Sequence, residues 1–450
     1  GEETVASIAL QLSFSAQGTD ADAIAAKITA AKAFTTEVAG SSANIIGFSG
    51  NDAAASARTW LATVTDDASA TSAVASVTSA VSDAVNAGNS SVAAQTIELT
   101  TGVNTGAGFT GGRGNDSFDA STAGSLDTVD VLDGGAGNDS LSATVGAESI
   151  RPTISNVETI RLTATADTLN IDTRDISGAT EYSSESSTGA LSINNLGSIP
   201  TVSINSSSDD TTINFTDAAL AGSSDSLTIN VNSYTQGGGE ALAVTDAGGT
   251  NVLETVTINS TSLGTTLTDL QLDGVGTTTL GVTGDAALTI NTALDNTVTT
   301  VTATDHSGGL TATLNGQNTT INTGSGADTI TLAGGNDTVN LGAGNDKLDG
   351  ASNVDTSDTL EGGAGTDTLD FGANAADMTT LTAVTGFEVV EVDGAVTVTL
   401  DDENVDDAGG SVTINETGAN AAVTVNAPVS AGKSVILGEA GSFTLDDVAN

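Results

Sequence analysis

From about residue 96 to the end of the chain, apolar residues alternate with Thr, Ser or Asn in short runs. Examples are residues 191–194, 202–205, 227–230 and 256–259. An alternation with period two places every second side chain on one face, so each run predicts a half-buried β-strand. The centres of successive runs are mostly 9 to 16 residues apart, which favours the stacked rungs of a solenoid. Aromatic residues make up only 3% of the chain, which suits narrow rungs better than a sandwich.

The first 95 residues follow a different pattern. They are rich in alanine, and apolar residues recur at helical spacing in three runs: Ile24, Ile28, Phe34 and Val38; Leu61 and Val64; and Val74, Val77, Val81 and Val85. Gly40 and Gly88 stand where the first and third helices are expected to end. A small helical domain is therefore predicted. Ahead of it, residues 4–16 alternate as in a strand, although Val5, Ile8 and Leu12 also fit one helix face, so both interpretations stay open.

These patterns predict a mainly β chain, a parallel β-roll or β-solenoid preceded by a small helical domain. We expect a helical N-terminal segment over residues 1–95, a glycine-rich cassette 1 over 96–145 and a Thr-, Asn- and Ser-rich solenoid over 146–321. A second glycine-rich segment, cassette 2, follows over 322–372, and a C-terminal β region completes the chain over 373–450.

Charge narrows the range of partners. The chain has 57 Asp and Glu residues against 9 Lys and Arg residues, a formal net charge of -48, which argues against binding to nucleic acid or to an anionic membrane. Cations are the natural partners, because the acids repel one another unless something neutralises them. There is no cysteine, so no disulfide can stabilise the fold. We therefore expect a bound metal ion to stabilise it instead. No transmembrane segment or export signal is visible, and we expect any such signal to have been removed or to lie outside this chain.

Glycine and aspartate recur at a fixed spacing in the two cassettes. Residues 111–119 match the nonapeptide G-G-x-G-x-D-x-U-x in full, where U is a large apolar residue, and residues 134–142 match it again. In cassette 2, Asp328, Asp337 and Asp346 are nine residues apart, Asp358 follows after three extra residues, and Asp367 comes nine residues later. A single copy is typical of an ordinary turn, but this register indicates a repeated structure.

The residue types in this nonapeptide suit a hard cation. Glycines let the backbone turn tightly and leave carbonyl oxygens exposed, while the aspartate supplies charge. Calcium takes six to eight oxygens, so its ligands must come from stacked turns. Calcium binding is therefore expected to be coupled to folding of the whole cassette.

The two cassettes resemble RTX repeats, and the layout resembles RTX-containing S-layer and related surface proteins of Gram-negative bacteria. The resemblance implies parallel β-roll turns that hold Ca²⁺ through the following residues: Gly112, Gly114, Asp116, Gly135, Gly137, Asp139, Gly324, Gly326, Asp328, Gly342, Gly344, Asp346, Gly363, Gly365 and Asp367. Asp130, Gly335, Asp337 and Asp358 are further candidate ligands. Two departures stand out, since Ala333 replaces a glycine and residues 352–357 contain none. Similar segments follow the two cassettes, at 154–160 and 384–390, which indicates a duplicated module.

The resemblance implies a secreted protein of the bacterial cell surface that assembles with calcium. We therefore expect a self-assembling structural protein, the subunit of an S-layer lattice or filament, with itself and cell-surface polysaccharide as partners. The alternative is a calcium-stiffened adhesin, which would be expected to show an aromatic-lined domain that the sequence pattern does not indicate. A carbohydrate epimerase or lyase on a β-helix is a third hypothesis, but it would depend on Tyr182 and Tyr234. With His306 as the sole histidine, a His-Glu-x-x-His zinc site is impossible, and we do not expect an enzyme.

Overall fold

The computed structural model describes residues 16–90, 92–146, 148–165, 169–249, 251–350, 353–373, 376–381, 383–418, 422–427, 430–438 and 442–446. The strand or helix expected over residues 4–16 lies outside them except for its last residue. The chain forms two compact units. The N-terminal unit comprises residues 1–143, 152–161 and 175–179, and the C-terminal unit comprises residues 144–151, 162–174 and 180–450.

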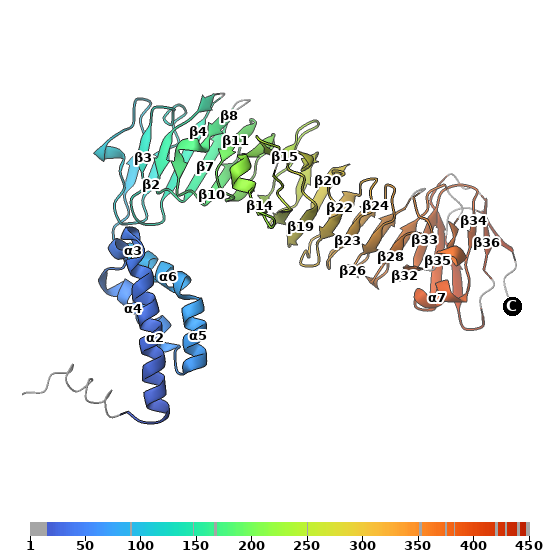
Figure 1. Cartoon of the computed structure of the whole chain (residues 1–450). Coiled ribbons are helices and arrows are strands. Elements are labelled where there is room, and N and C mark those ends of the chain that lie inside the picture. Colours follow the sequence, from blue (N-terminus) through green and yellow to red (C-terminus); the bar gives the residue numbers. More distant parts are fainter. Residues whose placement is uncertain are drawn as a thin grey trace, which may run out of the picture. The chain divides into compact units, whose positions relative to one another are not determined.

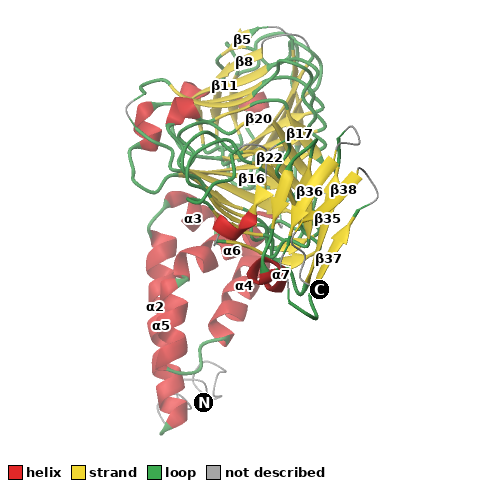
Figure 2. Cartoon of the chain, turned by 90° about the vertical axis from the view of Figure 1, so that its right-hand side faces the viewer, coloured by secondary structure: helices red, strands yellow, loops and turns green. Residues whose placement is uncertain are grey.

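The N-terminal unit begins with the expected helical region, drawn in red in Figure 2. Its helices are α2 (Thr19–Ala39), α3 (Ser42–Gly47), α4 (Gly50–Ala62), α5 (Asp67–Ala75) and α6 (Val77–Ser90). The third predicted helix is thus two helices that break at Ser76. The buried face of α2 consists of Ala26, Ala30 and Phe34, whereas Ile28 is exposed. Small alanines let α5 approach α2 closely, and this packing outweighs the preference for the larger isoleucine.

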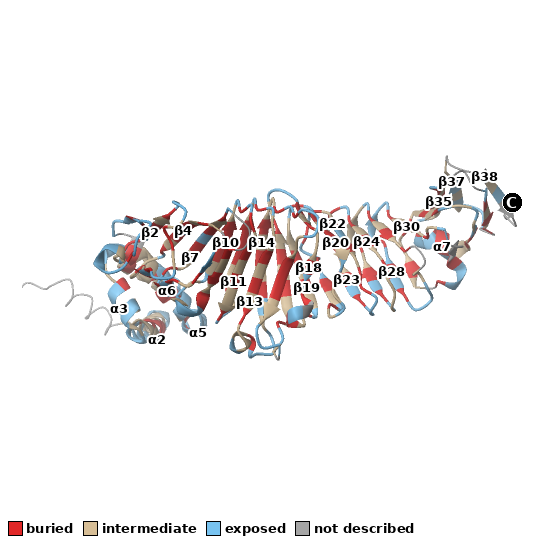
Figure 3. Ribbon diagram, turned by 90° about the horizontal axis from the view of Figure 1, so that it is seen from above, coloured by how far each residue is buried: buried red, intermediate tan, exposed pale blue. Residues whose placement is uncertain are grey.

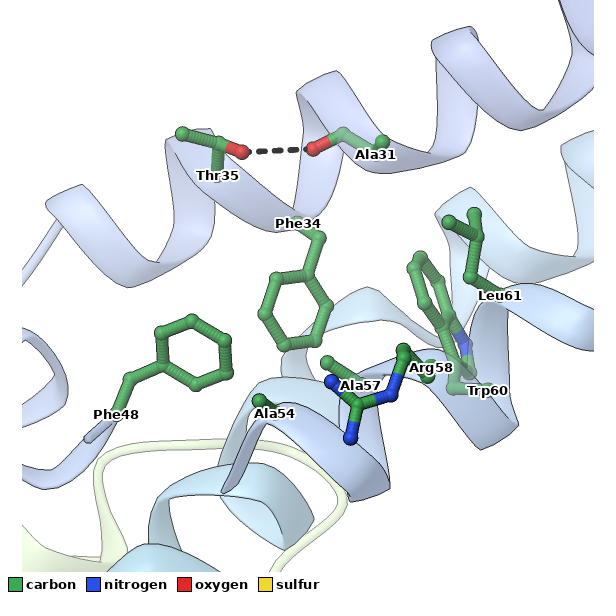
Figure 4. A pocket seen from close by; sticks show the side chains of 9 residues that line it. All are labelled: Ala31, Phe34, Thr35, Phe48, Ala54, Ala57, Arg58, Trp60 and Leu61. Atoms are coloured by element: carbon green, nitrogen blue, oxygen red, sulfur yellow. Dashed lines mark hydrogen bonds between the residues drawn. The ribbon is translucent and has the colours of Figure 1, made fainter. Parts of the chain in front are cut away.

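Three aromatic side chains meet in the helical region. The ring of Phe34 lies 5.4 Å from that of Phe48 and 5.3 Å from that of Trp60, measured between centroids. Together with Arg58 they line a pocket of about 300 Å³ formed by α2, α4 and Phe48 (Figure 4). The sequence pattern did not indicate this aromatic-lined pocket.

The rest of the N-terminal unit is built from parallel strands. They are β1 (Thr96–Glu98), β2 (Ser117–Ala120), β3 (Val131–Asp133), β6 (Thr153–Ser155) and β9 (Ile176–Ser177), together with residues 140–143 of β4 (Ser140–Val145) and residues 159–161 of β7 (Thr159–Ala164). β1, β2 and β4 pair side by side, and β3, β6 and β9 form a second small sheet. Phe118 of β2 pairs with Leu141 of β4, so the apolar residue two positions after each motif aspartate faces the core.

The C-terminal unit is a parallel solenoid whose strands stack in register (Figure 1). One long sheet has the order β10 (Glu181–Glu185), β12 (Thr201–Asn205), β14 (Ser226–Asn232), β16 (Thr255–Ser260), β19 (Thr279–Gly284), β21 (Thr300–Thr302), β23 (Thr320–Asn322), β25 (Thr338–Asn340), β28 (Thr359–Glu361) and β32 (Val384–Thr385). A second sheet contains β5 (Ser149–Ile150), β8 (Leu169–Asp172), β11 (Leu191–Leu196), β13 (Thr211–Phe215), β15 (Leu242–Asp246) and β18 (Leu270–Gln271).

A third sheet begins farther along the chain. It contains β17 (Thr265–Leu267), β20 (Leu288–Ala293), β22 (Leu310–Thr313), β24 (Thr329–Thr331), β27 (Lys347–Asp349), β30 (Thr368–Asp370), β33 (Val389–Val392), β35 (Ser411–Glu416) and β37 (Ser434–Leu437). Smaller sheets consist of β26 (Ala343–Gly344) with β29 (Ala364–Gly365), and of β31 (Ala376–Asp377), β34 (Thr397–Thr399), β36 (Ala422–Asn426) and β38 (Ser442–Asp446). Helix α7 (Asp402–Asp407) lies in the C-terminal part of this unit.

The core of the solenoid is a set of in-register ladders of aliphatic side chains. Ile229, Ile258 and Val282 pair in successive strands, and all three are fully buried. Buried and less buried residues alternate along the strands, as Figure 3 shows. The predicted fold class, a mainly β parallel solenoid with a small N-terminal helical region, is confirmed. None of the helices in the described part of the chain is long and apolar enough to cross a membrane.

Cassette 2 shows how the nonapeptide spacing becomes structure. Thr320 pairs with Thr338, 18 residues later, so one rung contains two nonapeptides. Thr338 then pairs with Thr359, 21 residues later. The three extra residues of the sequence therefore fall between the end of β27 at Asp349 and the start of β28 at Thr359, and the strand register is kept.

Candidate calcium sites

Three glycine-aspartate turns of cassette 2 stack at one edge of the solenoid. They span residues 323–328, 341–346 and 362–367 and lead from β23, β25 and β28 into β24, β27 and β30. Ile330, Leu348 and Leu369 pair in register, so the aspartate two residues before each of them occupies the same place in its rung. We call residues 324–328, 342–346 and 363–367 the glycine column.

One oxygen of each aspartate in the glycine column bonds to the main chain of the preceding rung. Oδ1 of Asp328 accepts from the Leu310 N–H at 2.7 Å. Oδ1 of Asp346 accepts from the Asp328 N–H at 2.7 Å, and Oδ1 of Asp367 accepts from the Asp346 N–H at 2.9 Å. The three carboxyl groups thus form a ladder that joins successive turns.

The other oxygen of each carboxyl group has no such partner. Oδ2 of Asp328, of Asp346 and of Asp367 is buried and accepts no hydrogen bond from the part of the chain that the structure describes. A buried charged oxygen without a partner costs free energy. Burial accordingly raises the pKa of Asp346 to about 6 and also raises the pKa of Asp328 and of Asp367. A cation beside these oxygens would remove that cost.

Main-chain carbonyl groups come very close in the same column. A Cβ atom at Gly344 would overlap the carbonyl oxygen of Gly326, and one at Gly365 would overlap that of Gly344. Only glycine therefore lets successive turns approach to this extent, and oxygens fill the space that side chains would take. Among the described residues no group of three or more His, Cys, Asp or Glu side chains could hold a metal. Any ion here must take most of its ligands from the backbone, which fits calcium.

Cassette 1 repeats this arrangement with two stacked turns within the N-terminal unit. The Asp116 N–H donates to Oδ1 of Asp139 at 2.6 Å, and a Cβ atom at Gly137 would overlap the carbonyl oxygen of Gly114. Oδ2 of Asp139 is buried without a hydrogen-bond partner among the described residues. Burial, reinforced by the nearby carboxylates of Glu158 and Asp116, raises the pKa of Asp139 to about 7. Asp116 differs, because its Oδ2 accepts from the Gly112 N–H at 2.5 Å.

A glutamate ends each ladder. Oε2 of Glu158 accepts from the Asp139 N–H at 2.6 Å, and Oε2 of Glu388 accepts from the Asp367 N–H at 2.9 Å. Neither glutamate was among the predicted site residues. The signal was present, because both occupy the fifth position of the duplicated segments 154–160 and 384–390.

The other predicted aspartates lie at the opposite turns. We call residues 315–319, 334–337 and 353–358 the opposite column. Oδ1 of Asp358 accepts from the Asp337 N–H at 2.9 Å and Oδ2 accepts from the Asp355 N–H at 2.8 Å. In cassette 1, Asp130 likewise accepts from the Asn104 and Asp127 N–H groups, both at 2.8 Å. Both oxygens of each carboxyl group thus already bond to the main chain.

The remaining candidate, Asp337, follows Gly335 in a turn whose neighbours contain no glycine pair. Its Oδ1 accepts from the Thr319 N–H at 2.9 Å. Burial raises the pKa of Asp337 to about 6. The structure therefore brings the candidates of the glycine column together and leaves Gly335 and Asp337 without a second glycine turn beside them.

The residues considered for catalysis lie in the core. Tyr234 is fully buried, its hydroxyl donates to the Asp209 carbonyl oxygen at 2.9 Å, and burial raises its pKa to about 12. Tyr182 is also buried, with a raised pKa for the same reason. His306 is 1% exposed. Neither ring nitrogen of His306 has a hydrogen-bond partner among the described residues.

Comparison with known proteins supports the cation assignment. A family model, the RTX calcium-binding nonapeptide repeat, matches four copies within residues 127–150, 315–352 and 354–375. These segments contain the second turn of cassette 1 and the whole glycine column. No curated protein and no solved structure matches the chain. With its stacked turns and its unpartnered aspartate oxygens, the chain contains RTX calcium-binding nonapeptide repeats within a parallel β-solenoid.

Proposed function

We propose that this protein is a calcium-dependent structural protein of the bacterial cell exterior that assembles with copies of itself into a lattice or filament. The observation that carries the calcium dependence is the column of buried, unpartnered oxygens of Asp328, Asp346 and Asp367. Extracellular calcium modules have dissociation constants of about 10⁻⁴ to 10⁻³ M, so such sites fill outside the cell. Calcium would complete the fold after export.

The unpartnered oxygens support the following choice of ion ligands. Asp328, Asp346 and Asp367 with the carbonyl groups of their glycine turns serve cassette 2, and Asp139 serves cassette 1. Asp130 and Asp358 instead fix turns through their hydrogen bonds. The ions also lower the repulsion within a chain of net charge -48, which favours the compact state.

An exposed apolar patch in the N-terminal unit supports self-association. Val103, Val129 and Val131 are 64%, 53% and 44% exposed. The segments that carry them are neighbours, because the Val131 N–H donates to the carbonyl oxygen of Asn104, the residue after Val103, at 2.9 Å. Clustered apolar side chains on a surface are typical of protein contacts, so we assign this patch to contact with another subunit.

Electron microscopy and circular dichroism with calcium, with magnesium and with a chelator test the proposal. We expect ordered sheets or filaments and full β content in millimolar calcium alone, and loss of both after chelation. Val129→Ser should weaken assembly and leave the β content unchanged. Unaltered β content after chelation would refute calcium-dependent folding, whereas a folded monomer at all calcium concentrations would refute assembly alone.

The aromatic pocket favours a second candidate, an adhesin that binds cell-surface polysaccharide. The partly exposed rings of Phe48 and Trp60 line the pocket beside the buried Phe34 and could stack on a sugar, and Arg58 offers a charged hydrogen-bond donor. A glycan array with the native chain and Trp60→Ala tests this. Polysaccharide binding that Trp60→Ala abolishes supports the adhesin, and no binding by the native chain overturns it.

A further inference from the structure

A glutamate takes a core position in the C-terminal part of the solenoid. Along β35, Val412 and Ile414 face inward, and Glu416 occupies the next inward position. It pairs in register with Val392 of β33, which is fully buried. Glu416 is itself only 1% exposed, so a carboxyl group stands where the pattern of the strand calls for an aliphatic side chain.

Only one of the two oxygens of the Glu416 carboxyl group has hydrogen-bond partners. Oε1 of Glu416 accepts from the Gly418 N–H at 3.0 Å and from the Gly394 N–H at 3.2 Å. Oε2 is buried and has no hydrogen-bond partner among the described residues. This is the condition found for the aspartates of the glycine column, where one oxygen bonds to the main chain and the other is left alone.

A second carboxyl group converges on the same place. A Cβ atom at Gly418 would overlap Oδ1 of Asp393 and would lie 2.9 Å from Oε1 of Glu416. Asp393 is exposed, so the pair is buried on one side and open to solvent on the other. Two neighbouring carboxylates repel each other unless a cation lies between them.

We propose that Asp393 and Glu416 hold a divalent hard cation, calcium, at a site outside the nonapeptide repeats. The matched repeat segments end at residue 375, and the two turns read Val392-Asp393-Gly394 and Glu416-Thr417-Gly418, without the nonapeptide motif. Carboxylate oxygens are the ligands that calcium prefers, and backbone carbonyl groups and water complete such sites. The exposed side of Asp393 gives the ion its entry. The site would fix β33 to β35 beyond the end of cassette 2.

Calcium counting on the full chain tests the site. Equilibrium dialysis should show that Glu416→Gln and Asp393→Asn each bind one calcium ion fewer than the native chain. Asp407→Asn removes the same charge from an exposed residue of α7 and serves as the matched control, with an unchanged count. The double variant Asp346→Asn/Asp367→Asn should remove calcium binding by the glycine column. Adding Glu416→Gln to this double variant should lower its calcium count by one further ion.

Hydrogen exchange locates the effect. Calcium should increase protection of peptides that cover β33 and β35 in the native chain and not in Glu416→Gln, while peptides of β24 to β30 respond in both. Asp393→Asn alters an exposed side chain and keeps the test valid if Glu416→Gln does not fold. An unchanged calcium count together with unchanged protection of β33 and β35 in Asp393→Asn would overturn the proposal and leave calcium binding by the cassettes intact.

Discussion

The glycine column and the opposite column of cassette 2 have the same nonapeptide spacing and different chemistry. In the glycine column three glycine-containing turns are stacked directly, and each aspartate keeps one unpartnered buried oxygen. In the opposite column a single glycine pair, at 334–335, stands between turns that lack one. The comparison teaches that one motif copy is not a site, because an ion between rungs needs two adjacent turns that both expose their carbonyl groups.

Side chains bond to backbone N–H groups in the turns of the opposite column. Oδ1 of Asn315 accepts from the Gln317 N–H at 2.9 Å, and Oδ1 of Asn318 accepts from the Asn336 N–H at 2.9 Å. Asp355 similarly accepts from the Ser357 N–H at 2.7 Å. Asparagine and aspartate side chains commonly bond to a nearby backbone N–H in turns. These bonds join and order the turns of the opposite column.

The largest difference between the columns should follow from adding one methyl group. Gly365 has φ of 154°, and its Cβ atom would overlap the Gly344 carbonyl oxygen. Gly365→Ala should therefore destabilise the calcium-bound protein by more than about 2 kcal/mol. Gly334 of the opposite column has no atom within 4 Å of a Cβ position, so Gly334→Ala is the matched control, expected within about 1 kcal/mol of the native chain. Thermal unfolding in millimolar calcium measures both.

Equal losses of stability in the two alanine variants would contradict this difference between the columns. A loss in Gly365→Ala that persists in a chelator would assign the effect to chain packing, whereas a loss seen only in calcium would assign it to the ion site.

Aspartate substitutions should separate metal binding from turn formation. Asp346→Asn removes the charge of an unpartnered oxygen, so the variant should bind fewer calcium ions and lose about 2.7 kcal/mol of stabilisation at a calcium concentration 100 times the dissociation constant. Asp358→Asn replaces a carboxylate oxygen that accepts from a backbone N–H by an amide NH₂ group, which cannot accept. This change should lower the free energy of unfolding by about 1 to 3 kcal/mol with or without calcium. Isothermal titration and chemical unfolding measure the two effects. A reduced calcium count in Asp358→Asn would show that the opposite column also holds an ion.

The sequence predicted the architecture because its determinants are local and repeated. Alternation placed strands such as β14 and β16, and the nonapeptide register placed Asp328, Asp346 and Asp367 in one column. Glu158 and Glu388 were not predicted as site residues, because each accepts a hydrogen bond from an aspartate N–H of the preceding rung. Their equivalent positions in the duplicated segments were nevertheless visible in the sequence. The buried state of Glu416 and the meeting of Phe34 with Trp60 depend on packing between distant segments, which no local pattern records.

The smallest expected effect is a pH dependence of the calcium-free fold. Burial raises the pKa of Asp139 to about 7 and of Asp346 to about 6, whereas an aspartate in an unfolded chain titrates near about 3.9. A carboxyl group whose pKa is higher in the native state favours folding while it is protonated. This contribution is complete below about pH 4 and is lost as the pH rises through about 6 to 7.

In a chelator, the melting temperature should therefore fall by about 2 to 4 °C between pH 5 and pH 8 for each kcal/mol that is lost. Salt at about 0.5 M screens the general repulsion of the acidic surface and isolates the contribution of the buried groups. Asp346→Asn should flatten the decline in part and Asp358→Asn should not, because only the first removes an unpartnered oxygen of the glycine column. Calcium should abolish the decline, since a bound cation favours the ionised carboxylate. A melting temperature that rises with pH in the chelator would mean that the buried oxygens of the glycine column have partners. The aspartates of the two columns would then not differ in their hydrogen bonding.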